Sequence, residues 1–180
     1  MYAIIDLEWT SWKNSNARKR NFSWEIKEII QIGVIKFEKD KKNIRIKNLI
    51  IKPIYNSKLS FYIQKLTGIN QFNLNARSIN LKTAIMQLNI FFRGTKKIYC
   101  NGLDKEVLEE NCKLNKISRP LFTNKIINIR PQISKILKKN SQEIISSELN
   151  EQIGLKPLKK HLATDDCINI LNFIRKFNLS

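Results

Sequence analysis

YAIIDLEWT, the stretch from Tyr2 to Thr10, is a mostly apolar run that leads into two acidic residues, Asp6 and Glu8. Successive side chains of a β-strand point to opposite faces, so the pattern predicts a strand with both acids on one face and Leu7 on the other. Two carboxylates side by side near a core repel each other and lose solvation, which is costly unless a cation lies between them. Oxygen ligands of this kind suit hard divalent cations, Mg²⁺ or Mn²⁺. The alternative interpretation is a surface strand with two solvated acids.

The composition is that of a strongly basic chain. Its 180 residues include 33 Lys and Arg against 15 Asp and Glu, which gives a formal net charge of +18. A chain of this length can bury one substantial core, so we expect a single domain over residues 1–180. A field of that sign attracts polyanions, and Lys and Arg commonly use it to neutralise phosphates. The composition therefore predicts nucleic acid as the partner.

The cysteines and the single histidine indicate which metal sites and which cellular compartment are expected. Three widely spaced cysteines and one histidine argue against a Cys/His zinc site and predict buried, reduced thiols. The amino-terminal stretch has acids where a signal peptide needs an unbroken apolar run, and no run of about eighteen apolar residues occurs. The sequence therefore predicts a soluble, cytoplasmic protein that does not associate with a membrane.

The remaining pattern predicts a mixed α/β sheet with flanking helices. We expect strands over residues 2–10, 28–38, 43–53, 97–100 and 126–129. Polar residues 39–42 would join the second and third strands as a hairpin. Helices are expected over residues 61–66, 80–93, 104–114, 132–137, 146–153 and 165–177. Three leading strands, followed by strands that alternate with helices, indicate a mixed five-stranded sheet with helices packed on it.

Residues 11–25 form a loop by composition. Trp12, Phe22 and Trp24 stand there among Lys, Arg and Asn. Aromatic rings and basic side chains together suit stacking on unpaired bases and contact with a phosphate backbone. The alternative is a solvated run of charges.

Further candidate residues lie near predicted helix starts. Asp104 follows a short strand, at the edge where ligands collect in open α/β sheets, although an Asp there also suits a helix N-cap. Thr164 is the expected N-cap of the last helix, which would place Asp166 in the first turn, where the helix dipole favours carboxylates. His161 would then lie on the preceding loop, either as a surface histidine or as a mobile base beside a metal ligand. This single histidine stands five residues before an Asp in a chain with five Asp, which favours the second interpretation.

At this point the sequence resembles a known family. Asp6-Leu7-Glu8, Asp104 and His161-x-x-x-x-Asp166 match, in order and approximate spacing, the three motifs of the DEDDh, or DnaQ-like, 3′–5′ exonucleases. That family has a ribonuclease H-like fold, and the resemblance covers nearly the whole chain. Local matches to the histone-mRNA exonuclease and KapD-like branch occur at residues 28–34, 66–69, 103–112 and 161–170.

The resemblance implies two divalent cations held by Asp6, Glu8 and Asp166, with Asp104 assisting largely through bound water. It also implies that His161 is the general base, a role that suits a group with a pKa near 7. The expected activity is the release of nucleoside 5′-monophosphates from the 3′ end of single-stranded nucleic acid or 3′ overhangs. RNA is favoured slightly over DNA, on the branch resemblance.

Candidate substrate contacts stand beside the first and third motifs. Thr10 matches a threonine that follows the first motif, where the family approaches the terminal nucleotide. Trp9 is assigned with it, and a core aromatic is the equal alternative for Trp9. Lys156, Lys159 and Lys160 precede the histidine and are candidates for phosphate contacts.

Two other functions stay open. One is a DNA-trimming or proofreading exonuclease subunit of a larger nucleic-acid-processing complex, which predicts equal or better degradation of single-stranded DNA. The other is a nucleic-acid-binding module that keeps the fold and the charge without turnover. The intact set of motif residues counts against the second.

Overall fold

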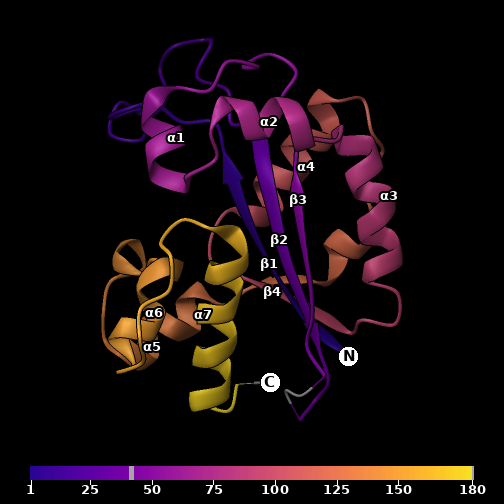
Figure 1. Ribbon diagram of the computed structural model, residues 1–180. Coiled ribbons are helices and arrows are strands. Elements are labelled where there is room, and N and C mark those ends of the chain that lie inside the picture. The colour runs from indigo at the N-terminus through magenta and orange to yellow at the C-terminus, as the bar shows by residue number, and fades with distance from the viewer. Residues whose placement is uncertain (41–42, 180) are drawn as a thin grey trace.

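A five-stranded sheet runs through the middle of the molecule in the computed structural model, which describes residues 1–40 and 43–179 (Figure 1). The strands are β1 (Tyr2–Trp9), β2 (Ile29–Phe37), β3 (Arg45–Ile50), β4 (Lys97–Cys100) and β5 (Ile126–Asn128). Their order is β3-β2-β1-β4-β5. The pairs β1–β2 and β2–β3 are antiparallel, and β1–β4 and β4–β5 are parallel. The predicted mixed sheet is therefore confirmed; residues 41 and 42 of the predicted connection lie outside the described part.

Helices cover both faces of this sheet (Figure 1). One face carries α3 (Leu81–Phe91) and α4 (Asp104–Leu114). The other carries α5 (Arg130–Leu137), α6 (Leu149–Gln152) and α7 (Ala163–Lys176). The described residues also include short 3-10 turns at Leu121–Lys125, Ser141–Glu143 and Ser146–Glu148.

The alternation of β1 feeds two separate cores. Ile5 and Leu7 pack among apolar residues of α3 and α4. Ile4 packs on the opposite face among apolar residues of α7. Because the side-chain period of a strand is two, Asp6 and Glu8 share the face of Ile4 and point to the side covered by α7.

A pair of short helices, α1 (Phe61–Thr67) and α2 (Gln71–Arg77), closes one end of the sheet beside residues 11–25 (Figure 1). Residues 11–25 contain only turns and bends among the described elements, as expected for a loop. Ser60 joins the two regions, since its hydroxyl caps α1 by accepting a hydrogen bond from the amide of Ile63 and donates to the carbonyl of Ser11. The first turn of α1 is thereby fixed to the loop.

Some helix boundaries differ from the predicted ones. The sequence pattern does not predict α2, because Leu74 is its one buried residue and gives no periodic signal. The helix expected over residues 146–153 is a 3-10 turn followed by the single turn α6. The helix expected over residues 132–137 begins two residues earlier, with Pro131 as the second residue of α5, where its missing N–H costs nothing.

Two smaller predictions concern thiols and membranes. Cys100, Cys112 and Cys167 are buried and form no disulfide, as expected. Within residues 1–40 and 43–179, the helices are too short or too polar for any of them to span a bilayer.

Candidate active site

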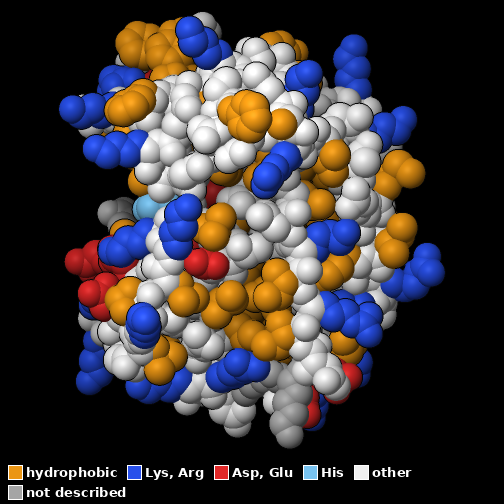
Figure 2. Space-filling view, viewed as in Figure 1, with side chains coloured by type: hydrophobic (Ala, Val, Ile, Leu, Met, Phe, Trp, Pro, Cys, Tyr) orange, Lys and Arg blue, Asp and Glu red, His pale blue; other side chains and the backbone are white. Residues whose placement is uncertain are grey.

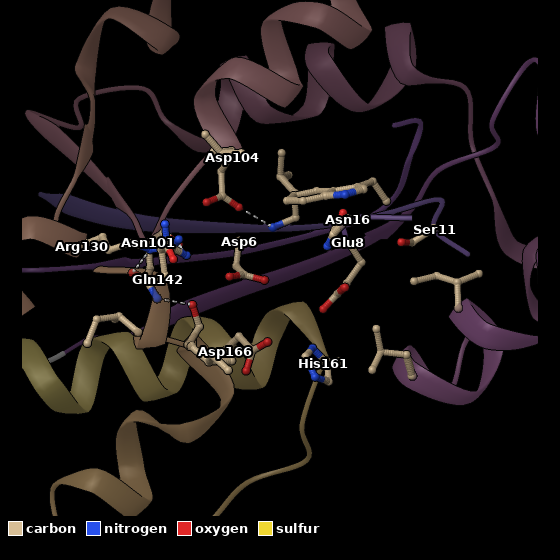
Figure 3. Close-up of a pocket in the computed structure, with 18 of the residues that line it drawn as sticks. Asp6, Glu8, Ser11, Asn16, Asn101, Asp104, Arg130, Gln142, His161 and Asp166 are labelled. Carbon is tan, nitrogen blue, oxygen red and sulfur yellow. Dashed lines mark hydrogen bonds between the residues drawn. The ribbon is translucent and has the colours of Figure 1, made fainter. Parts of the chain in front are cut away.

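A cavity of about 360 Å³ lies at the end of β1, within the range of roughly 300–1,000 Å³ common to ligand pockets (Figure 3). The parallel pairing of β1 with β4 ends at Ile4, which lies opposite Tyr99. Asp6 and Glu8 therefore extend past the pairing and line the cavity. Their exposed fractions are 7% and 9%, so both are buried acids rather than the solvated ones of the alternative interpretation.

Asp104 brings a third carboxylate to this cavity. Leu103 occupies the N-cap position of α4 and Asp104 is the first helical residue, so the N-cap alternative for Asp104 is wrong. Its Oδ1 instead accepts a hydrogen bond of 3.0 Å from the backbone amide of Leu7. Figure 3 shows Asp104 on the opposite side of Asp6 from α7.

The start of α7 supplies the fourth carboxylate, Asp166. Thr164 is not its N-cap, because the helix already begins at Ala163. The approach of this helix to β2 requires Gly33, where a Cβ would lie 2.4 Å from the carbonyl carbon of Ala163. The amide of Ala163 also donates a hydrogen bond of 3.2 Å to Oε1 of Gln31. Close contact between β2 and α7 therefore sets the position of Asp166.

His161 lies just before α7, on the loop that was predicted. Its backbone has φ 54°, a left-handed conformation that costs a non-glycine residue about 1–2 kcal/mol. One ligand atom each from Glu8, His161 and Asp166 lies within 4.8 Å of the others. Burial lowers the pKa of His161, and the charge of Lys160 lowers it further. The imidazole is therefore held neutral at pH 7, the form that accepts a proton.

Burial raises the pKa of all four carboxyls, and repulsion from nearby carboxylates adds to this effect. The pKa of Glu8 rises to about 8, through burial first and then the charges of Asp166 and Asp104. The pKa of Asp166 rises to about 7 and that of Asp104 to about 6, in both cases mainly through burial. Burial and the three neighbouring carboxylates raise the pKa of Asp6 well above its usual range. Ionising this group of acids together is costly without a compensating positive charge.

The donor set fits divalent metal ions. Carboxylate oxygens from Asp6, Glu8, Asp104 and Asp166 surround the cavity, and oxygen ligands are those that Mg²⁺ and Mn²⁺ prefer. A cation among them would offset the repulsion that raises their pKa values. The cluster is therefore able to hold a metal ion, as the first motif indicated.

A polar wall that the sequence did not predict closes one side of the cavity. Asn101 follows β4, and its Nδ2 donates to Oγ of Ser146 at 2.8 Å. The guanidinium of Arg130 donates to Oδ1 and to the carbonyl of Asn101 at 3.1 and 2.6 Å. Gln142 completes this wall (Figure 3). In the sequence, only the position of Asn101 at the end of a strand could have indicated this polar wall.

Apolar side chains also line the cavity. They include Trp9, Leu103 and the α1 residues Tyr62, Ile63 and Leu66. Trp9 packs against the core, as one of its two interpretations expects, and it also lines the cavity.

Thr10 is placed differently from the other motif residues. It is 2% exposed, and its hydroxyl donates to the carbonyl of Ile26 at 2.6 Å and accepts from the amide of Glu28 at 3.0 Å. These bonds close the base of the loop formed by residues 11–25. The side chain of Thr10 therefore acts within the fold, and the described lining of the cavity does not include it.

The three lysines before the histidine lie outside the described lining of the cavity. Lys160 pairs with Glu148 at 3.0 Å on the surface. Lys159 extends toward α1, where its Nζ lies 2.9 Å from the place that a Cβ on Gly68 would take. Lys156 is exposed. These side chains stand around the cavity rather than in it.

Lys and Arg side chains are spread over the visible face, among hydrophobic and uncharged ones (Figure 2). With a net charge of +18, this surface surrounds a cavity whose own ionisable groups are mostly acidic. A polyanion would be attracted to the surface, whereas the cavity itself favours cations.

One protein-family model matches most of the chain. The family model described as RNase_T, Exonuclease, matches residues 3–174. No curated protein matches the chain.

Several solved structures share the fold. The nuclease domain of 3′hExo, described as a DEDDh family member bound to rAMP, has a TM-score of 0.83 and 23% identity, over 98% of this chain and 91% of that one. A 3′-exonuclease described as recognising the 3′ end of a histone mRNA stem-loop has a TM-score of 0.83 and 22% identity, over 98% and 81%. Cell-death related nuclease 4 (CRN-4) has a TM-score of 0.79 and 20% identity, over 99% and 64%. The ribonuclease H-like fold expected from the sequence is confirmed.

Proposed function

The chain belongs to the RNase_T exonuclease family, and from this premise we propose that it removes nucleoside 5′-monophosphates one at a time from the 3′ end of single-stranded nucleic acid or of 3′ overhangs. The observation that carries the proposal is the convergence of Asp6, Glu8, Asp104, Asp166 and His161 on one cavity. These residues come from β1, α4 and the start of α7 and its preceding loop, which are distant in sequence.

Each residue has a distinct proposed role. Asp6, Glu8 and Asp166 would hold two divalent cations, Mg²⁺ or Mn²⁺, with Asp104 assisting through bound water. When bound, such cations stabilise the negative charge that develops on the oxygens of a phosphodiester during in-line displacement. His161 would take the proton of the attacking water at a ring nitrogen, because it is neutral and adjoins Glu8 and Asp166.

Neighbouring residues would position the substrate. The ring of Trp9 and the aliphatic side chain of Leu103 line the cavity and suit contact with a terminal base. Thr10 would contact the substrate through backbone atoms of its segment, because its hydroxyl already donates one hydrogen bond and accepts another within the fold. Lys156, Lys159 and Lys160 would add to the positive field outside the cavity that attracts phosphates.

RNA is the proposed preferred substrate. The local sequence matches are to the histone-mRNA exonuclease branch, and two structural neighbours are described with rAMP and with an mRNA stem-loop. The 2′-hydroxyl is the group by which a protein distinguishes RNA from DNA. A preference for DNA would instead favour a trimming or proofreading role.

The test uses 5′-labelled single-stranded RNA and DNA oligonucleotides of one sequence, with Mg²⁺, Mn²⁺ or EDTA, followed over time on a sizing gel. The wild type should produce a ladder that shortens from the 3′ end and that EDTA abolishes. Asp6→Asn should stop the shortening. Glu109→Gln is the matched control, because this carboxylate lies on the surface of α4 and pairs with Arg119.

Persistence of shortening in Asp6→Asn would contradict the assigned site. Absence of shortening by the wild type with either cation would overturn the proposed activity. Faster shortening of DNA than of RNA would reverse the substrate preference and leave the rest of the proposal standing.

A further inference from the structure

A second hollow adjoins the catalytic cavity along the outer side of α1. It is lined by Lys13, Phe61, Tyr62, Lys65 and Leu66, and we call this surface the α1 groove. Tyr62 and Leu66 line both the α1 groove and the catalytic cavity. The two hollows therefore adjoin each other at these two side chains of α1.

The apolar members of the α1 groove are not part of the core. Phe61 is 80% exposed and Tyr62 is 39% exposed, although both belong to a helix that buries Ile63. Ile63 alone of these three packs in the cluster beneath α1 and α2. Because large exposed apolar residues that adjoin one another mark interaction sites, the α1 groove is a candidate for one.

The charges around these rings are positive. Lys13 and Lys65 line the α1 groove itself. Lys159 adds a third ammonium at the far end of α1, against Gly68. Aromatic faces flanked by ammonium groups are the arrangement that proteins use to stack unpaired bases and to follow a phosphate backbone.

The groove is also held in place. Ser60 joins the first turn of α1 to the carbonyl of Ser11, close to Lys13 in the chain. The carboxylate of Glu28 accepts hydrogen bonds from the backbone amides of Ile54 and Asn56, each at 2.6 Å, and so fastens the segment before α1. A backbone fixed in this way loses little conformational freedom when a ligand binds.

We propose that the α1 groove binds the substrate RNA strand just upstream of the nucleotide in the catalytic cavity, with bases on Phe61 and Tyr62 and phosphates at Lys13 and Lys65. The inference rests on the proposed function, because it takes the strand that occupies the cavity as its occupant. A strand whose 3′ end enters the cavity has to pass over the surface beside it, and the α1 groove adjoins the cavity at Tyr62 and Leu66. The contacts involve base faces and phosphates, so they select for unpaired strands and not for a base sequence.

The test measures binding separately from turnover. A fluorescein-labelled RNA decanucleotide is titrated in EDTA, which prevents hydrolysis, and anisotropy gives Kd for the wild type and for the double variant Phe61→Ala/Lys65→Gln. Both side chains are exposed, and Ala and Gln are good helix formers, so the variant should fold. The matched control is Phe72→Ala/Lys82→Gln, which removes an equally exposed phenyl ring and one charge outside the α1 groove.

The double variant should bind the decanucleotide about tenfold more weakly than the wild type, with a salt dependence of log K reduced by about 0.7. The control should bind like the wild type, and AMP should compete equally for all three proteins. In turnover, KM for the decanucleotide should rise while kcat stays close to that of the wild type.

Equal affinity of the wild type and the double variant would overturn the inference and leave the α1 groove to a protein partner. Equal weakening in the control would also overturn it, since the effect would then be one of general charge. If the wild type shortens no substrate, the proposed activity fails, and the anisotropy comparison still decides whether the α1 groove binds RNA.

Discussion

The amide of Leu7 donates a hydrogen bond of 3.0 Å to Oδ1 of Asp104, a residue 97 positions further along the chain. Leu7 lies between Asp6 and Glu8, so this bond fixes the carboxylate of the second motif directly against the first. Because a buried amide needs a partner, the same contact serves folding and the geometry of the site.

Asp104→Asn should separate these two roles. The amide oxygen can still accept from Leu7, so we expect a melting temperature equal to or above that of the wild type, since one repelling charge is gone. Activity should fall by about 100-fold or more if Asp104 assists the cations as proposed, because the site then loses one of its four carboxylates. Initial rates of 3′ shortening and thermal melts measure the two effects.

Asp104→Ala should also lose stability, because it leaves the amide of Leu7 buried and unpaired at a cost of about 1–3 kcal/mol. For a chain of this size each kcal/mol lowers Tm by about 2–4 °C. A wild-type rate in the Asn variant would remove Asp104 from the site, and equal Tm values in both variants would contradict the role of the bond.

The metal-free protein should lose stability as the pH rises from about 4.5 to about 8. Glu8 has an ordinary pKa of 4.5 that the fold raises to about 8. Between these values the folded state binds more protons than the unfolded state, so the free energy of unfolding falls with rising pH. Thermal melts in EDTA across this range measure the effect.

Saturating Mg²⁺ or Mn²⁺ should flatten that pH dependence, because a cation stabilises the ionised carboxylates of the folded state. Glu8→Gln should reduce the pH dependence without metal, and the part that remains should come from Asp6, Asp104 and Asp166, whose pKa values are also raised. If the free energy of unfolding in EDTA rises with pH instead, the fold does not raise the pKa values of these acids.

Gly33→Ala should disturb the site from a distance. The new Cβ would lie within 2.4–2.6 Å of backbone atoms of Ala163 and Thr164, so the start of α7 has to move away from β2. We expect a loss of about 1–3 kcal/mol and a fall in activity at temperatures where the variant is folded, since Asp166 and His161 move with the helix.

Gly94→Ala is the control for that variant. Its φ of 73° makes alanine unfavourable, whereas no described atom lies within 4 Å of the new Cβ. It should lose comparable stability and keep its activity when folded. Retention of full activity by Gly33→Ala would show that the β2–α7 contact does not position the site.

His161→Asn should lose activity while keeping stability. Asparagine tolerates the left-handed backbone at φ 54° better than most residues, so the loop should keep its conformation. Loss of a general base typically costs 10²–10⁴-fold in rate, that is, about 100-fold or more.

A profile of log rate against pH at saturating cation concentration provides the second readout. In the wild type, activity should rise with pH through a value below 6.5, because the fold lowers the pKa of His161 from that ordinary value. The residual rate of His161→Asn should not show this step. Its persistence in the variant would assign the step to another group.

The positions of strands and motifs could be predicted from the sequence, because they depend on the order of apolar and polar residues within short segments. The alternation in YAIIDLEWT predicts β1 and the shared face of Asp6 and Glu8, and apolar runs predict β4 and the order of the elements after it. The boundaries of β4 and α4 agree with the structure residue for residue. Short or weakly periodic pieces were not predicted well, since α2 and residues 146–153 have too few turns to show a period.

The sequence by itself determined the mixed sheet, the four carboxylates and the loop position of His161, because side-chain alternation and helix starts are set by neighbouring residues. Only the tertiary structure decided that Arg130 and Ser146 line the cavity, that Thr10 is bonded within the fold, and that α1 lines both the cavity and a second groove beside it. Those relationships join segments tens of residues apart. They depend on how close packing at positions such as Gly33 brings helices against the sheet, which no local pattern encodes.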